Sequence, residues 1–198
     1  MKKPAITQAP IHGLIANRWS GRAYDPAQPV TRQQVITLLE AARWAPSCYG
    51  DQPWRFVLWN RDEDAGAWRT AFETLAPGNQ VWVKDAPLLL LVCADSLFNH
   101  NGKPNRWAQY DSGAAAENLC LQAEALGLMA HQMGGFDPDK ARVVASVPQQ
   151  YTPMAMMAVG HPADPATFSE EVRERETAPR QRRELGELFF GGVWGRSV

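Results

Sequence analysis

Two arginine-rich stretches near opposite ends of the 198-residue chain carry the side chains best suited to chemistry. The first reads RWSGR at 18–22. In an extended backbone Arg18, Ser20 and Arg22 point to the same side, and two guanidinium groups with a hydroxyl can grip a phosphate. The second stretch reads RQRR at 180–183. From the spacing alone, each stretch could instead be a solvated charged segment.

A third candidate is the connection at 45–54, which reads APSCYGDQPW. It joins an apolar helix pattern to a strand pattern, and an ordinary connection of that kind needs only turn residues. This one places Ser47, Cys48 and Gln52 between two prolines. The simpler interpretation is a tight turn that buries Trp54 in the core.

The sequence lacks the usual phosphate-binding loops of nucleotide-binding α/β folds, which place a glycine-rich turn after the first strand. Residues 60–66 read NRDEDAG, and their three acidic side chains would repel a pyrophosphate. Neither a GxGxxG nor a GxxxxGK[ST] pattern occurs. Any bound anion would therefore have to be held by the arginines.

Composition excludes several other classes. The formal net charge of −1 lacks the basic excess typical of nucleic-acid-binding proteins. The first residues, MKKPAITQAPIHG, do not resemble a signal peptide, and the longest apolar run, at 86–94, is shorter than the roughly 20 residues that span a bilayer. Three cysteines and four scattered histidines form no disulfide, zinc or other metal pattern. We expect a reduced cytoplasmic protein with no membrane or nucleic-acid partner.

Alternating helix and strand patterns predict one layered domain around a single sheet. Thr31 begins a helix with Gln34 as its capping-box partner, and Pro46 ends it. Asp137 and Pro138 begin another helix. The remaining predicted elements are helices at 62–76 and 111–126 and strands at 54–59, 88–93, 129–133 and 154–159.

The tail from about 163 to 198 differs from the rest of the chain. It is charged at first and then ends with LFFGGVWG at 188–195. Large apolar side chains in a tail are seldom left in water, so we expect it to wrap a neighbour, and a second subunit is the natural candidate.

Five motifs in this order resemble the FMN-dependent nitroreductase family. They are RWSGR before a helix, APSxxxxQPW, GGFD, VGHP and a late RxR, and together they cover about residues 15–190. The resemblance implies an α+β fold in three α/β/α layers, with a central, mostly antiparallel sheet flanked by helices. It also implies that residues 1–198 form a single domain, and that two subunits intertwine as a homodimer with the 163–198 extension wrapped around the partner.

The resemblance also implies which residues bind FMN in a groove at the dimer interface. Arg18, Ser20 and Arg22 would hold its phosphate, ribityl and pyrimidine side, the backbone of Trp19 would face it, and Arg180 and Arg182 would bind its phosphate. Other implied contacts are Pro46, Ser47 and Cys48 from the second subunit, Gln52 beside them, Asn79 at the pyrimidine, and Gln132, Met133, Gly134 and Gly135 over the reactive edge.

Four positions depart from the pattern of the family. Gly50 stands where asparagine is frequent, Cys48 where a second serine is frequent, and Gly134 where glutamate is frequent. Trp82 occupies a position that is lysine in some members. The absence of a carboxylate at residue 134 could change substrate preference.

The implied activity is a two-electron oxidoreductase. NADH or NADPH would reduce FMN, and a nitroaromatic, quinone or similar small acceptor would then reoxidise it at the same place, in ping-pong order. The chemistry belongs to the flavin, so no catalytic side chain is nominated. Phe98, Trp107 and Tyr110 could stack on an aromatic acceptor or be ordinary anchors. Dehalogenation, enoate or enal reduction, flavin breakdown and a non-catalytic flavin-binding dimer remain alternatives.

Overall fold

The computed structural model describes residues 3–198, which build a four-stranded sheet in the order β1-β2-β4-β3. All neighbouring strands are antiparallel. The strands are β1 (Trp54–Asn60), β2 (Leu88–Asp95), β3 (Met129–Met133) and β4 (Tyr151–Gly160). Each predicted strand is present, and the predicted antiparallel α+β class is confirmed.

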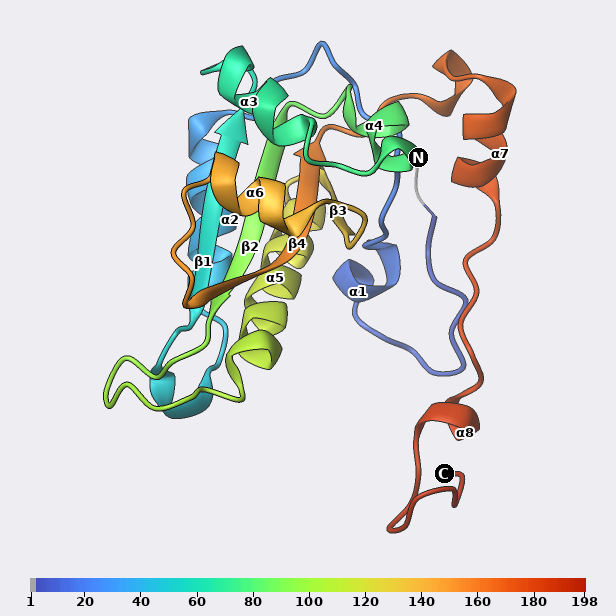
Figure 1. Cartoon of the computed structure of the whole chain (residues 1–198). Coiled ribbons are helices and arrows are strands. Elements are labelled where there is room, and N and C mark those ends of the chain that lie inside the picture. The colour runs from blue at the N-terminus through green and yellow to red at the C-terminus, as the bar shows by residue number, and fades with distance from the viewer. Residues whose placement is uncertain (1–2) are drawn as a thin grey trace.

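The central strand β2 explains why the domain has three layers. All of its residues are buried, because helices cover both faces of the sheet (Figure 1). Leu88 and Leu90 pack with α2 (Arg32–Arg43) and α5 (Ala108–Ala125) on one face. Leu89 and Leu91 pack on the other face, under α3 (Ala65–Phe72), α4 (Pro77–Val83) and α6 (Pro138–Val144). A run of apolar residues without alternation is what a strand buried on both faces requires.

Capping residues set the helix starts that the sequence predicts. The backbone N–H of Gln34 donates to Thr31 Oγ1 at 3.2 Å, and the Gln34 side chain accepts from the Thr31 backbone, which completes the capping box. Asp137 caps α6, and Pro138 is its first residue.

The helix predicted at 62–76 is shorter than expected. It begins only after Asp64, whose side chain accepts from the Ala67 N–H, and it ends at Phe72. The chain then begins a second helix, α4, with Pro77 at its start. Two other boundaries also differ: α2 ends at Arg43, three residues before Pro46, and α5 begins at Ala108 rather than at 111.

Residues 163–198, called the C-terminal arm below, leave the body and run beside the N-terminal segment (Figure 1). The arm contains a 3-10 turn (Pro165–Thr167) and the helices α7 (Glu170–Thr177) and α8 (Leu185–Leu188), and the N-terminal segment leads into α1 (Gly13–Asn17). Arg180 Nη1 donates to the carbonyls of Lys3 and Ala16 at 2.9 and 2.7 Å. These bonds fasten the two ends of the chain together.

Within the part of the chain that the structure describes, no helix is both long and apolar enough to cross a membrane.

Candidate functional site

The arginines from opposite ends of the chain lie close enough to repel one another. Burial lowers the pKa of Arg180 most, and the positive charges of Arg18 and Arg182 lower that pKa further. Arg18 donates from Nη1 to Ser20 Oγ at 3.3 Å, and its Nε lies 3.4 Å from Glu117 Oε1 on α5. Arg18, Arg180 and Arg182 are called the arginine cluster below.

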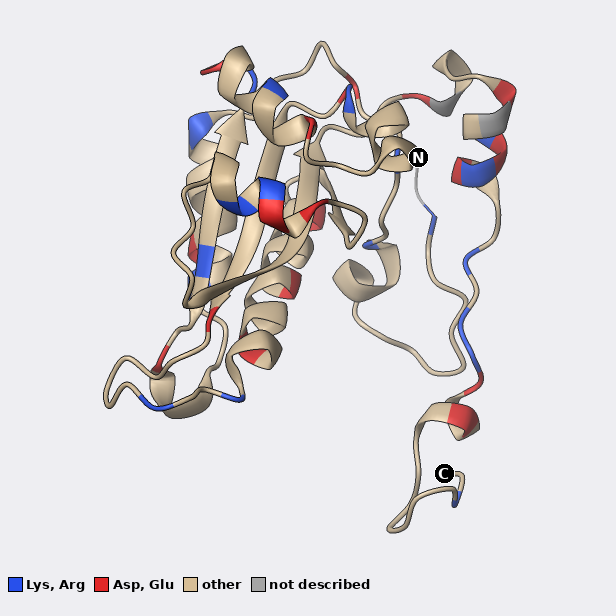
Figure 2. Cartoon of the chain, in the orientation of Figure 1, with Lys and Arg blue, Asp and Glu red and all other residues tan. Residues whose placement is uncertain are grey.

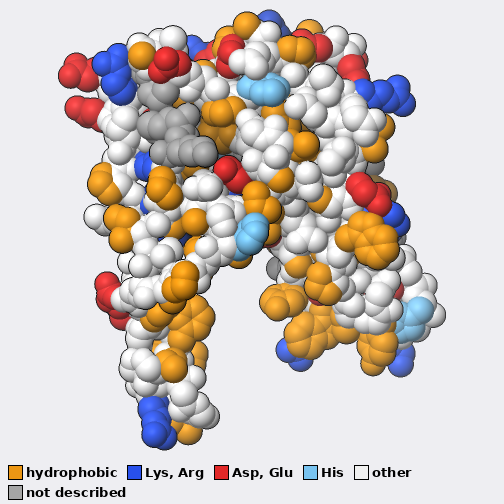
Figure 3. All heavy atoms as spheres, turned by 180° about the vertical axis from the view of Figure 1, so that it is seen from behind, with side chains coloured by type: hydrophobic (Ala, Val, Ile, Leu, Met, Phe, Trp, Pro, Cys, Tyr) orange, Lys and Arg blue, Asp and Glu red, His pale blue; other side chains and the backbone are white. Residues whose placement is uncertain are grey.

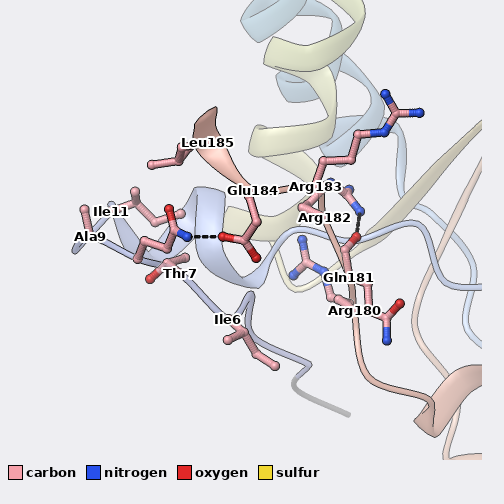
Figure 4. A pocket seen from close by; sticks show the side chains of 11 residues that line it. Ile6, Thr7, Ala9, Ile11, Arg180, Gln181, Arg182, Arg183, Glu184 and Leu185 are labelled. Atoms are coloured by element: carbon pink, nitrogen blue, oxygen red, sulfur yellow. Dashed lines mark hydrogen bonds between the residues drawn. The ribbon is translucent and has the colours of Figure 1, made fainter. Parts of the chain in front are cut away.

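A cavity of about 500 Å³ lies beside the arginine cluster, between the N-terminal segment and the C-terminal arm. Residues 6–11 supply Ile6 and Ile11 to its wall, and residues 180–185 supply the opposite wall (Figure 4). The guanidinium of Arg183 points away from those of Arg180 and Arg182 (Figure 4). Arg180 Nη1 donates to carbonyls at the other end of the chain, whereas Arg182 Nη1 donates to the Gln181 carbonyl at 2.8 Å.

The 18–22 segment has the alternation that the sequence predicts. Gly21 is buried, while Ser20 and Arg22 on either side of it are exposed. The guanidinium carbon of Arg22 lies 6.0 Å from the centre of the Trp82 ring, and Lys3 Nζ lies 4.5 Å from that of Trp19. Positions of Lys and Arg lie along both the N-terminal segment and the arm where the two run side by side (Figure 2).

The segment after β3 combines an anchored glycine with an open one. Asn79 Nδ2 donates to the carbonyl of Gly135 at 2.8 Å, and the Ala76 N–H donates to it at 2.9 Å. A Cβ at Gly135 would lie 2.7 Å from Asn79 Nδ2, whereas a Cβ at Gly134 would meet no atom within 4 Å. The backbone at Gly134 is therefore held in place and open to close approach by a ligand.

The two residues before these glycines face different surroundings. Met133 is buried in the core, so only its backbone can contribute to a site. Gln132 is exposed on the edge strand β3, and its Nε2 donates to Cys120 Sγ at 3.5 Å. Burial raises the pKa of the Cys120 thiol to about 12, so this cysteine is an inert packing group.

The 46–52 loop is tied to the N-terminal end of α5. The Cys48 N–H donates to Asp111 Oδ2 at 2.9 Å, and the Gln52 N–H donates to Ser47 Oγ at 3.1 Å. Tyr49 and Gln52 have positive φ angles of 56° and 51°, a left-handed conformation that non-glycine residues rarely adopt. Such strain in a short loop is often found at functional sites.

The structure holds this loop and the arginine cluster at different levels of α5. The loop is bonded to Asp111, whereas Arg18 pairs with Glu117, six residues and therefore roughly 9 Å further along the helix at 1.5 Å per residue. Pro46 is the first residue of the 46–52 loop and directly precedes Ser47 and Cys48.

The predicted acceptor-stacking residues lie beside the same loop. The rings of Phe98 and Tyr49 are 6.0 Å apart, and Asp51 Oδ1 accepts from the Asn99 N–H at 2.9 Å. Trp107 and Tyr110, at the start of α5, are both exposed. Nothing in the sequence links the two loops, so the sequence gives no signal for Tyr49 or Asp51.

Comparison with known protein families gives a clear match. The model of the nitroreductase family matches residues 15–161, which is more than half of the chain. The chain belongs to the nitroreductase family. It is thus an oxidoreductase of that family, as the five sequence motifs predict.

Individual relatives of this nitroreductase-family chain cover most of its length. It is 37% identical to an uncharacterised 15.4 kDa protein from Mycolicibacterium smegmatis, over 73% of this chain and 99% of the relative. It is 30% identical to a Methanothermobacter thermautotrophicus protein provisionally named NADH dehydrogenase/NAD(P)H nitroreductase, over 80% and 81% of the two chains. A solved oxidoreductase containing FMN superimposes with a TM-score of 0.89 at 34% identity, over 98% of this chain and 97% of that one.

The donor set of this chain fits the phosphate end of a flavin nucleotide. The acids near the three guanidinium groups are Glu117, about half exposed, Glu124, whose charge opposes the lowering of the Arg180 pKa, and Glu184, which lines the same cavity. Neighbouring guanidinium groups repel one another, and a bound dianion relieves that repulsion. Among the residues that the structure describes, no group of three or more His, Cys, Asp or Glu side chains could hold a metal ion.

Proposed function

We propose that this chain is an FMN-dependent oxidoreductase that takes electrons from NADH or NADPH and reduces nitroaromatic, quinone or similar small acceptors. The observation that carries the proposal is that Arg180, from the C-terminal arm, donates to the carbonyl of Ala16, two residues before Arg18. The positive charges of Arg18 and Arg182 act on Arg180 there. The names of an NAD(P)H nitroreductase relative and of an FMN-containing structure support the choice of cofactor and reductant.

The residues of this chain would bind and orient the cofactor. The arginine cluster would hold the phosphate, Ser20 and Arg22 would contact the ribityl chain and ring system, and the open backbone at Gly134 would let the reactive edge approach. Asn79 would keep Gly135, and so this backbone, in place. When bound, FMN would supply two-electron redox chemistry, first as acceptor from NAD(P)H and then as donor, in ping-pong order.

A homodimer would complete the site. The 46–52 loop of a second subunit would supply Pro46, Ser47 and Cys48, with Gln52 beside them, as the family resemblance implies. A notch separates the C-terminal arm from the loop end of the body, and apolar side chains gather on both sides of it (Figure 3). Phe189, Val193 and Trp194 of the arm are more than half exposed, as expected of a segment that wraps a partner.

Aromatic side chains beside that loop favour a planar acceptor. Phe98, Trp107 and Tyr110 would stack on it, and Tyr49 would extend the same surface. Dehalogenation, enoate or enal reduction, flavin breakdown and cofactor storage without turnover are the alternative outcomes of the test.

An absorbance spectrum of the purified, undenatured protein tests the cofactor, because bound FMN absorbs visible light. NADPH or NADH should then bleach the flavin anaerobically, and menadione or nitrofurazone should restore it. Bleaching without reoxidation by either compound would favour the other chemistries. A colourless protein that takes up no added FMN would overturn the proposal.

A further inference from the structure

One peptide group in the 18–22 segment is bonded at both ends by ionisable side chains. The carbonyl of Gly21 lies 3.0 Å from His131 Nδ1, and the N–H of Arg22, on the same peptide group, donates to Glu176 Oε1 at 3.0 Å. His131 is on β3, and Glu176 is on α7 of the C-terminal arm. The peptide group therefore joins the sheet to the arm.

Glu176 is a buried acid used for backbone bonding. Its exposed fraction is only 2%, and besides the Arg22 N–H its carboxylate faces the N–H of Ala23. Burial raises its pKa, and these hydrogen bonds and the charges of Lys3 and Arg22 partly oppose that rise. Burying a carboxyl group is costly unless it is well bonded, so its location calls for a specific role.

His131 completes the arrangement from the opposite side. A carbonyl oxygen can only accept, so Nδ1 of His131 carries the hydrogen in this bond. The imidazole ring lies against Trp82, with the ring centres 4.5 Å apart. Burial lowers the pKa of His131 most, the bond to the Gly21 carbonyl opposes this, and Arg22 and Arg18 lower the pKa further, so burial and these charges favour the neutral ring.

Close packing at Gly21 leaves this peptide group little freedom. A Cβ there would lie 2.2 Å from Met129 Sδ, 3.0 Å from Glu176 Oε2 and 3.0 Å from the Trp19 ring. Relieving such short contacts would require the side chains of Met129, Glu176 and Trp19 to shift. Any rotation of the peptide would also redirect Ser20 and Arg22 on either side.

We propose that Glu176 and His131 are positioning residues that lock the Gly21–Arg22 peptide and thereby aim Ser20 and Arg22, beside Arg18, at the bound flavin nucleotide. Because Glu176 belongs to the C-terminal arm, docking of the arm and completion of the site are a single event. This inference rests on the proposed function, since it assumes that residues 18–22 bind FMN.

Paired substitutions test the proposal through FMN affinity, measured by fluorescence quenching. His131→Leu should weaken FMN binding about tenfold or more, the scale expected when a buried carbonyl loses its hydrogen-bond partner. His131→Asn should restore most of the affinity, because an amide N–H can take the place of Nδ1–H.

Glu176→Gln should weaken FMN binding several-fold, since the NH₂ group of the glutamine would face one of the two backbone N–H donors. Glu174→Gln, at an exposed position on the same helix, should have no effect.

Amide hydrogen exchange without FMN provides an independent readout. The amides of Arg22 and Ala23 should exchange faster in Glu176→Gln than in the wild type, while β2 amides should be unchanged. Wild-type protein that binds no FMN would sink the proposed function, and the exchange rates would still decide whether the lock exists. The proposal would be overturned if His131→Leu and Glu176→Gln both bind FMN as tightly as the wild type, or if the Arg22 amide exchanges at the same rate in Glu176→Gln as in the wild type.

Discussion

The backbone N–H of Cys48 donates to the carboxylate of Asp111 at 2.9 Å, and this bond holds a strained loop against the start of a helix. Asp111 is buried, at 4% exposed. The loop itself contains left-handed Tyr49, Gly50 and Gln52. A loop with three such residues keeps its shape only when the surrounding contacts hold it.

Asp111→Ala is expected to loosen this loop and destabilise the protein. The loss of a buried, charge-assisted hydrogen bond costs about 1.5–3 kcal/mol of the free energy of unfolding, which urea titration can measure. Asp111→Asn keeps an oxygen acceptor and should lose less. If the alanine variant matches the wild type in stability and in amide exchange at Cys48, the carboxylate does not hold the loop.

Substitution by alanine should destabilise the protein at Gly135 but not at Gly134. Gly135→Ala puts a Cβ 2.7 Å from Asn79 Nδ2, so the amide must move and its bond to the Gly135 carbonyl is disturbed. We expect a loss of about 1–3 kcal/mol in stability, as for other overpacked sites. Gly134→Ala meets no atom within 4 Å and should leave stability unchanged.

FMN affinity gives the second half of that comparison. If the open side of Gly134 faces the reactive edge of the cofactor, Gly134→Ala should weaken FMN binding although the apoprotein is as stable as the wild type. Equal FMN affinity in Gly134→Ala and the wild type would mean that the open space beside Gly134 serves another purpose.

Strong local signals made most of the fold predictable. The buried strand β2 is an unbroken apolar run, and the capping box at Thr31 forms as expected. The helix α4 was not predicted because it is only seven residues long and begins with a proline followed by a glycine. Such a short segment has no periodicity to detect, and its position is set by packing of Trp82 and Val83 in the core.

The site was predictable only in part, for a different physical reason. The sequence indicates a shared side for Arg18, Ser20 and Arg22 and singles out the arginines at 180–183, and the family resemblance assigns both groups to one ligand. Glu176 gave no signal, because it lies in the acidic stretch EEVRERET, where its neighbours Glu174 and Arg175 are exposed. Tertiary packing alone distinguishes a buried acid from solvated ones.

Replacing Arg18 and Arg182 together by alanine should strip FMN from the protein. Each charge-assisted bond to a phosphate is worth about 1.5–3 kcal/mol, so the double variant should bind at least a hundredfold more weakly. Arg183→Ala is the matched control, because its guanidinium points away from the cluster (Figure 4). Circular dichroism should show unchanged helix content. Stoichiometric FMN in the purified double variant would place the phosphate elsewhere.

Stability should fall as the pH is lowered through the ordinary pKa of histidine, because of His131. Burial, Arg22 and Arg18 lower its pKa below the ordinary histidine value of about 6.5, while the bond to the Gly21 carbonyl opposes them. The unfolded chain therefore binds a proton at a higher pH than the folded chain does, so the contribution of His131 is complete above about pH 6.5 and is lost below it. The difference in Tm between pH 7.5 and 5.5 should be smaller in His131→Asn. An identical difference in both proteins would refute this role.

Deleting residues 185–198 should weaken the dimer without removing the arginine cluster or Glu176. The deleted part carries Phe189, Val193 and Trp194, which are 55%, 64% and 91% exposed in the isolated chain. Burying such side chains contributes about 1.5–3 kcal/mol each, so their loss should shift the monomer–dimer equilibrium by several orders of magnitude. Sedimentation velocity over a range of concentrations measures that shift. Leu185→Ser, a single change within the deleted stretch, should produce a smaller one. A truncated chain that dimerises as tightly as the full chain would show that the end of the arm does not wrap a partner.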